Sequence, residues 1–329
     1  VLGRRRAAGD PGGAAAVGLP EQRQTWNIRQ FFPLRFRDAA GGIPDEDFRA
    51  FQSTLGVDVA ALCFDGPPEA LAQTHQCQLA LFVTSVAAVA GFQTLASTQT
   101  VVGMAGLSLG ELTALCVAEA FTFHDALYLV QARGDLMAEC ATHHPGAMLA
   151  VLGLSNQAID ALCEESGATG ANYNAPEQIV LSGTVEAIEK AERLAKAQGA
   201  TRAIRLSVTG AFHSVLMQPA ADTFRRVLAK VTIRPPKVPV ISNVTAQPVH
   251  DPDAIRQLLV QQITSPVLWE LSMRHLISLG ATQCVEFPPA RVLTGLLRRI
   301  DRSVQGIAVE APKDLETLAS VSPVREKIT

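Results

Sequence analysis

The sequence predicts an α/β fold, in which helices cover both faces of a parallel sheet and a smaller module is inserted into this core. Two observations lead to this prediction. Beyond about Phe51, helical periods alternate with short β-branched runs. From Met148 to Val208 the elements follow a different order. The chain has 329 residues and a hydrophobic content of 48%, enough to bury a large core.

Four β-branched runs are the clearest predicted strands. They are TVVGMAG near Val101, AIRLSV near Ile204, VPVISN near Val240 and CVEF near Val285. Helical segments follow three of them, after Gly110, His213 and Pro289. In an open α/β sheet, ligands bind at the carboxyl ends of the strands, which is where these turns are expected.

The predicted organisation has four parts. Residues 51–147 and 209–318 form the core, and residues 1–50, rich in Arg, Ala and Gly without hydrophobic periodicity, form a divergent or disordered N-terminal segment. Residues 319–329 are a C-terminal tail. Residues 148–208 read as strand, helix, two strands around Asn174 to Gly183, helix, strand, which is the order of a ferredoxin-like subdomain. A cleft beside this insertion is the expected ligand site.

Composition and charge argue against several classes of function. A net charge of -3 and an aromatic content of 5% are untypical of nucleic-acid binding. Residues 76–110 carry no charge, but polar residues interrupt the run, so a buried helix and a buried strand are favoured over a membrane span. Six scattered cysteines and seven histidines show no metal-ligand pattern.

The sequence GLSLG places Ser108 between Gly106 and Gly110. An apolar strand precedes the motif and an amphipathic helix follows it, as in the nucleophile elbow of α/β-hydrolase-like cores. We expect neither glycine to tolerate a side chain in so sharp a turn. The N–H of Leu109, at the helix N-terminus, is then a candidate donor to an oxyanion. The alternative is a serine that only caps the helix.

Two further residues complete the candidate site. His213 lies between a predicted strand and a helix, so its imidazole is expected at the same sheet edge as Ser108, as a candidate base. Arg133 shares an apolar helix face with Ala126, Val130 and Met137. A buried guanidinium needs an anion, which is either an internal carboxylate or a carboxylate that arrives with a substrate.

Together, these stretches resemble the malonyl-CoA:acyl carrier protein transacylases and the related acyltransferase domains of polyketide synthases. The resemblance runs from about Leu55 to Leu315. It is carried by LGVDVAALCFDGPPEAL, THQCQLALFVTS, GLSLGELTAL, FHDALYLVQARGDLM, NYNAPEQIVLSG, GAFHS, SNVTAQPV, QITSPVLW and RVLTGL.

The resemblance implies a role for each motif residue. Ser108 matches the acylated serine, His213 its base, and Arg133 the arginine that pairs with the free malonyl carboxylate. Gln262 matches a glutamine near the active site, and Asn243 lies in a strand-end motif beside it. The implied partners are malonyl-CoA and an acyl carrier protein, for fatty-acid or polyketide biosynthesis. No cofactor, metal, nucleic acid or membrane is implied, and a monomer is expected.

The chain departs from the family pattern in two places. The family's GQGSQ-type N-terminal loop has no counterpart, the nearest string being GLPEQRQ around Gln22, and Pro288, Pro289 and Ala290 replace a GPG turn. A weakened enzyme, or an inactive paralogue that binds a carrier protein, is therefore one alternative. A serine hydrolase is the other, and its triad acid would be Asp125, Asp135 or Asp160. The stretches GLSLGE and GAFHS resemble those of plant and algal members of the family, which favours a plastid location. Mitochondrion and cytoplasm are the alternatives.

Overall fold

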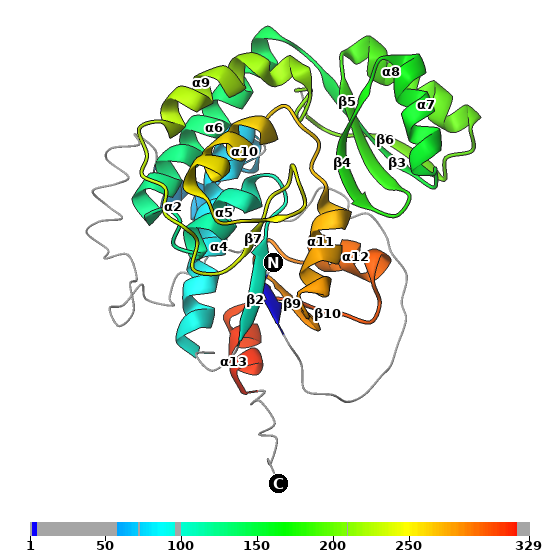
Figure 1. The fold of residues 1–329 in the computed structure, drawn as a ribbon. Helices are drawn as coiled ribbons and strands as arrows, with labels where there is room; N and C mark the ends of the chain where they lie inside the picture. The colour runs from blue at the N-terminus through cyan, green and yellow to red at the C-terminus, as the bar shows by residue number, and fades with distance from the viewer. Residues whose placement is uncertain (1, 5–57, 72, 96–99, 209, 321–329) are drawn as a thin grey trace.

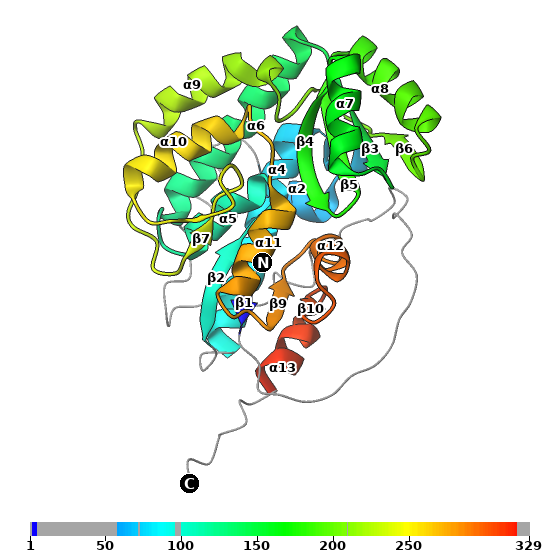
Figure 2. The same ribbon diagram turned by 45° about the vertical axis from the view of Figure 1, so that its right-hand side comes forward.

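The computed structural model describes residues 2–4, 58–71, 73–95, 100–208 and 210–320. Within these residues the chain forms a six-stranded and a four-stranded sheet surrounded by helices (Figures 1 and 2). The protein is thus a mixed α/β protein. The strands of the larger sheet are β1 (Leu2–Arg4), β2 (Val101–Ala105), β7 (Val240–Ile241), β8 (Pro248–Val249), β9 (Gln283–Glu286) and β10 (Gln305–Ala308).

The helices fall into three groups along the chain. Those before the smaller sheet are α2 (Val59–Asp65), α3 (Pro68–Leu71), α4 (Thr74–Leu95), α5 (Leu109–Val117) and α6 (Phe123–His143). Those within it are α7 (Asn156–Ser166) and α8 (Val185–Ala197). Those after it are the 3₁₀ turn η2 (Val215–Met217), α9 (Gln218–Leu228), α10 (Pro252–Gln262), α11 (Trp269–Ser278), α12 (Val292–Ile300) and α13 (Pro312–Ser320).

The larger sheet is mixed, which corrects the prediction of a parallel sheet. Its order is β10-β9-β1-β2-β7-β8. The pairs β10–β9 and β2–β7 are parallel, whereas β1 pairs antiparallel with both β2 and β9, and β8 pairs antiparallel with β7. The short return from β7 to β8 makes that pair a hairpin, which β-branched composition alone does not reveal.

A strand at Leu2–Arg4 lies within residues 1–50, the segment that the sequence predicts to be divergent or disordered. It lies between β2 and β9, so its backbone is paired on both sides, and the Leu2 side chain is 4% exposed. Three residues are too few to show a period of two, and backbone pairing needs no particular side chains. The remainder of that segment, with the GLPEQRQ string, lies outside the described residues, as does the predicted tail beyond Ser320.

The four-stranded sheet is built from one continuous stretch of chain. Its strands are β3 (Ala147–Leu152), β4 (Thr169–Ala175), β5 (Gln178–Gly183) and β6 (Arg202–Arg205), in the order β4-β5-β3-β6 with antiparallel neighbours. The six elements follow one another as the sequence predicts. β6 contains the β-branched run near Ile204 and pairs with β3, as the last of the four strands along the chain.

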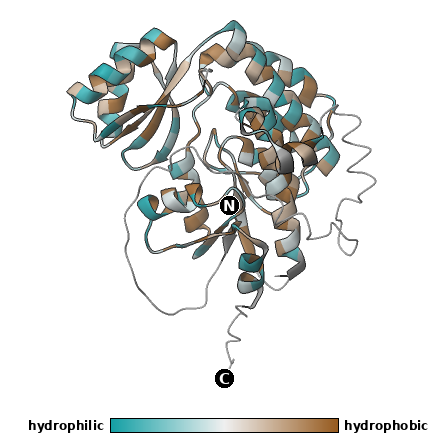
Figure 3. Ribbon diagram, turned by 180° about the vertical axis from the view of Figure 1, so that it is seen from behind, coloured by the Kyte–Doolittle hydropathy of each residue, from teal (hydrophilic) through white to brown (hydrophobic). Residues whose placement is uncertain are grey.

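Helix α4 forms part of the hydrophobic core. Its segment Thr74–Gln93 is long and apolar enough to cross a membrane, but 56% of the most hydrophobic window is buried within the fold. Phe82, on this helix, is fully buried and stacks on Phe123 of α6 with ring centroids 5.6 Å apart. The outer helices carry hydrophilic and hydrophobic stretches in alternation, as expected of helices with one buried face (Figure 3).

Candidate active site

Ser108 lies in the turn between β2 and α5. Its backbone has φ 52°, in the left-handed region that favours glycine. Ser108 is the N-cap residue of α5, yet its side chain makes no capping hydrogen bond. The hydroxyl is held instead by two side chains described below, so the geometry disfavours the capping alternative. Strained backbone of this kind is common at functional sites.

The two glycines of the motif differ, which corrects the expectation that both are required. A Cβ at Gly106 would lie 1.9 Å from the backbone carbonyl carbon and oxygen of Gly110, so no side chain fits there. A Cβ at Gly110 would meet nothing within 4 Å. The turn therefore needs a bare backbone only at its first glycine.

The His213 imidazole lies within hydrogen-bond distance of Ser108. Its Nε2 is 2.9 Å from Ser108 Oγ, and its Nδ1 is 2.8 Å from the backbone carbonyl oxygen of Gln262. A carbonyl only accepts, so Nδ1 carries the proton and Nε2 is free to accept from the serine. Burial, together with the charge of Arg133, lowers the pKa of His213 to about 4. The imidazole is therefore neutral at physiological pH.

This contact also bears on the choice between hydrolase and transferase. A hydrolase triad would place Asp125, Asp135 or Asp160 against Nδ1. That position is held by the Gln262 carbonyl. The arrangement is a serine–histidine pair oriented by backbone.

The Arg133 guanidinium is buried, with 1% of the residue exposed, on the predicted apolar face of α6. Its Nη2 donates to Ser108 Oγ at 2.8 Å and to Gln262 Oε1 at 3.1 Å. Its Nη1 donates to Gln78 Oε1 at 2.5 Å. Burial lowers the pKa of Arg133 to about 10, and the guanidinium still carries its charge at neutral pH.

No carboxylate of the described residues forms an ion pair with Arg133, although the sequence allowed for one. Its buried Nε has no hydrogen-bond partner among them. A charged group with neutral partners and an unused donor is suited to receive an anion.

Asn243 and Gln262 fix the turn from the opposite side. Asn243 Oδ1 accepts from the Ser108 N–H at 2.6 Å, and its Nδ2 donates to the Gly106 carbonyl at 2.8 Å. Gln262 Nε2 donates to the Ser108 carbonyl at 3.1 Å. The turn is therefore held by side chains from the loop after β7 and from the end of α10, which lie more than 130 residues further along the chain.

The structure brings the six sequence-predicted residues to one turn. Leu109 is the first residue of α5, so its N–H lies outside the hydrogen-bond ladder of the helix and is available to an oxyanion. Ser108, His213 and Arg133 are joined by direct hydrogen bonds. Gln262 contacts all three, and Asn243 contacts Ser108.

Sequence reasoning missed two polar residues of this site. Gln78, on α4, accepts from Arg133, and Glu111, on α5, accepts from Asn243 and Gln262. The signal for both was present, because each is a polar side chain in an otherwise apolar helical stretch. Such a side chain, once buried, needs partners from other elements.

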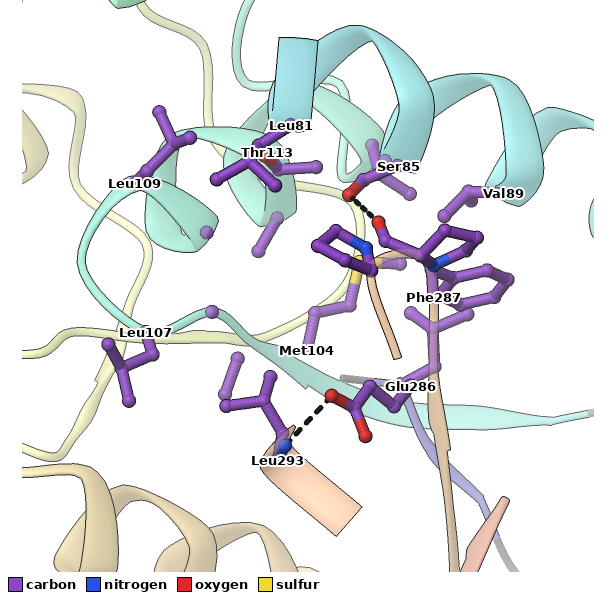
Figure 4. Close-up of a pocket in the computed structure, with 18 of the residues that line it drawn as sticks. Leu81, Ser85, Val89, Met104, Leu107, Leu109, Thr113, Glu286, Phe287 and Leu293 are labelled. Atoms are coloured by element: carbon purple, nitrogen blue, oxygen red, sulfur yellow. Dashed lines mark hydrogen bonds between the residues drawn. The ribbon is translucent and has the colours of Figure 1, made fainter. Parts of the chain in front are cut away.

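A cavity of about 270 Å³ lies on the other side of the turn (Figure 4). Its wall is mostly apolar and includes Leu81 and Val89 of α4, Met104 of β2 and Phe287. Ser85 donates to the Pro288 carbonyl at 2.5 Å across one end. Pro288 and Pro289, at the positions compared above with a GPG turn, line this cavity. Neither residue takes part in the hydrogen bonds among Ser108, His213 and Arg133.

The described residues contain no cluster of three or more His, Cys, Asp or Glu side chains that could hold a metal ion. Burial raises the pKa of the Cys63 and Cys116 thiols to about 12. These thiols stay protonated and are poor ligands and nucleophiles.

Comparison with known proteins identifies the family. Residues 37–313 match the acyl transferase domain family. The chain belongs to this family. It is 41% identical, over 274 residues, to a malonyl CoA-acyl carrier protein transacylase of Bacillus subtilis, covering 82% of this chain and 86% of that protein.

Solved acyl transferase structures share the fold. An acyl carrier protein S-malonyltransferase from Vibrio cholerae superposes with a TM-score of 0.79 at 37% identity, covering 82% of this chain and 90% of that one. A malonyl-transacylase in complex with a type II polyketide acyl-carrier protein gives a TM-score of 0.81 at 35% identity, with coverages of 90% and 94%. The turn at Ser108 lies within the region matched to the family.

Proposed function

We propose that this protein transfers a malonyl group from malonyl-CoA to the phosphopantetheine thiol of an acyl carrier protein, through a malonyl ester on Ser108. The relatives named above carry this activity in their names. The observation that carries the proposal is the buried Arg133 guanidinium, which lies 2.8 Å from the serine hydroxyl and has no carboxylate partner among the described residues.

The guanidinium accounts for the choice of acyl group. A malonyl ester on Ser108 has a free carboxylate within a few bond lengths of the ester carbonyl carbon. Arg133 offers it charge and a planar set of donors, of which Nε has no partner among the described residues. A neutral acetyl group gives the guanidinium no charged partner, so it is bound less well.

In the first half-reaction, His213 Nε2 takes the proton of Ser108 Oγ as the oxygen attacks the thioester carbonyl. The Leu109 N–H is our proposed donor to the oxyanion. The C–S bond then breaks, and the CoA sulfur leaves with the proton from the imidazolium. The Nδ1–H bond to the Gln262 carbonyl keeps the ring oriented throughout.

In the second half-reaction the roles reverse. The phosphopantetheine thiol gives its proton to His213 Nε2, and its sulfur attacks the malonyl-serine carbonyl. The C–O bond breaks, and Ser108 Oγ recovers the proton. The chemistry requires only these groups of the chain and its two substrates, so we propose no cofactor and no metal.

The finer description of the fold is also a proposal. We propose a hydrolase-like core over residues 51–147 and 209–318, with a ferredoxin-like subdomain at residues 148–208. The strand–turn–helix at Ser108 supports the first, and the order β4-β5-β3-β6 with two helices supports the second. We further propose that the protein acts as a monomer in a plastid, which gel filtration and a fluorescent fusion of the full-length chain would test.

Labelled malonyl-CoA tests the proposal directly. We expect label on Ser108 of the isolated protein, its transfer to added holo acyl carrier protein, and no label on Ser108→Ala. Ser85→Ala, which removes a hydroxyl on the other side of the same turn, is the matched control and should retain labelling. Release of free malonate without transfer would support a hydrolase, and absence of label would support an inactive paralogue.

A further inference from the structure

Glu111 is a buried acid at the centre of the site. It lies in the first turn of α5, three positions after Ser108, and is 1% exposed. Its Oε2 accepts from the Asn243 N–H at 3.0 Å and from Gln262 Nε2 at 2.6 Å. A buried carboxylate is costly unless such donors satisfy it, so its position calls for a reason.

Both partners of Glu111 contact the reacting groups. Asn243 clamps the backbone on either side of Ser108. Gln262 contacts Arg133 through Oε1, Ser108 through Nε2 and His213 through its carbonyl. Glu111 is therefore linked to Ser108, His213 and Arg133 through a single intervening residue, Gln262.

The carboxylate helps to fix which way the Gln262 amide points. The amide NH₂ faces three acceptors, of which Glu111 Oε2 is the nearest at 2.6 Å; the others are the Ser108 carbonyl and Asn243 Oδ1, while the amide oxygen faces the Arg133 donor. The flipped amide would set its oxygen against three acceptors and its NH₂ against a guanidinium, so only one orientation is compatible with these neighbours.

We propose that Glu111 is a positioning residue, whose carboxylate fixes Gln262 and Asn243 and through them orients the Arg133 guanidinium and the Ser108 turn. It also supplies a counter-charge to Arg133 without pairing with it, because the Gln262 amide lies between them. The guanidinium thereby stays open to a substrate carboxylate. This inference rests on the proposed function, because its test measures the preference for malonyl-CoA over acetyl-CoA.

The test compares Glu111→Gln with Glu286→Gln in the full-length protein. Glu286 is equally buried and lines the apolar cavity, and its carboxylate accepts from the N–H groups of Arg291, Leu293 and Thr294, none of which hydrogen-bonds to Ser108. The measurement is kcat/KM for malonyl-CoA divided by kcat/KM for acetyl-CoA. A fraction of unfolded enzyme lowers both values equally and leaves this ratio unchanged.

We expect Glu111→Gln to lower the malonyl-to-acetyl ratio about tenfold, since a neutral amide at 111 accepts more weakly from Gln262 and Asn243 and removes the negative charge near Arg133. Glu286→Gln should leave the ratio unchanged while lowering the melting temperature. Glu111→Asp keeps the charge on a shorter side chain, so its ratio should lie between those of wild type and Glu111→Gln. This variant replaces Glu111→Gln in the test if Glu111→Gln does not fold.

An unchanged ratio in a folded Glu111 variant would overturn the proposal. If the wild-type protein takes no malonyl label, the proposed function fails instead, and reaction of Ser108 with phenylmethanesulfonyl fluoride replaces the substrate assay. Glu111→Gln should then slow that sulfonylation about tenfold relative to wild type and Glu286→Gln. Equal rates would overturn the positioning role independently of the substrate.

Discussion

The two sides of the turn at Ser108 differ in what holds them. On one side, hydrogen bonds join Ser108 to Asn243, Gln262, His213 and Arg133. On the other side lies a cavity whose wall is mostly apolar. Substitutions on the first side should therefore change the reaction, and those on the second should change stability.

The largest effect is expected from Arg133→Ala. The ratio of kcat/KM for malonyl-CoA to that for acetyl-CoA should fall roughly 100-fold, because the substrate carboxylate loses a buried charged partner. Arg133→Lys keeps the charge but not the planar donors, so its ratio should lie between those of the wild-type protein and Arg133→Ala. Steady-state kinetics with both thioesters measures this, and a malonyl preference that survives Arg133→Ala would remove the proposed role.

Gly106→Ala should be the most destabilising change at the turn itself. Its Cβ would overlap the Gly110 backbone, so the turn must open, and we expect the free energy of unfolding to fall by roughly 3 kcal/mol. Urea denaturation followed by circular dichroism measures the loss. A variant as stable as wild type would show that the turn is looser than the contacts indicate.

The pH dependence should separate the two buried titratable groups beside Arg133. Burial raises the pKa of Glu111 to about 7, whereas the pKa of His213 is lowered to about 4. An acid with a raised pKa is ionised only above that value, so the rate of Ser108 acylation should fall severalfold as the pH drops from 8 to 6. His213 stays a neutral base over this range.

Glu111→Gln provides the control for this profile. It should acylate more slowly but at a constant rate from pH 8 to about 5, because the titrating carboxylate is gone and His213 is still neutral. Single-turnover labelling at each pH gives the comparison. An inflection near pH 7 that persists in Glu111→Gln would assign it to another group.

Gly110→Ala should have the smallest effect. The new Cβ enters open space at the start of α5, and alanine favours the helix over glycine, so the free energy of unfolding should rise by about 0.5 kcal/mol. The same urea experiment measures it beside Gly106→Ala. A loss as large as that of Gly106→Ala would contradict the difference between the two glycines.

The parts of the structure that sequence predicted best are those with local contacts. The six elements of the smaller sheet are consecutive, and their periodicity indicated each of them. Arg133 was found because helical spacing placed it on an apolar face that proved buried. Ser108 was found because strand, turn and helix are adjacent in the chain.

The remaining features of the fold and the site depend on contacts that cannot be inferred from residue types. The partner of His213 is a backbone carbonyl, which any residue at position 262 would supply. The strand at Leu2–Arg4 is placed by pairing with β2 and β9, from distant parts of the chain. Gln78 and Glu111 stood out as polar residues in apolar helices, but only the three-dimensional arrangement shows which groups they satisfy.

The strand β4 is also tied to the segment that follows Gln262. The Tyr173 N–H donates to the Val267 carbonyl at 2.9 Å, and the Val267 N–H donates to the Ala171 carbonyl at 2.8 Å. Val267 stands five positions after the glutamine whose carbonyl orients His213. A shift of β4 would therefore be passed through these two hydrogen bonds and five residues of chain to the carbonyl that orients the imidazole.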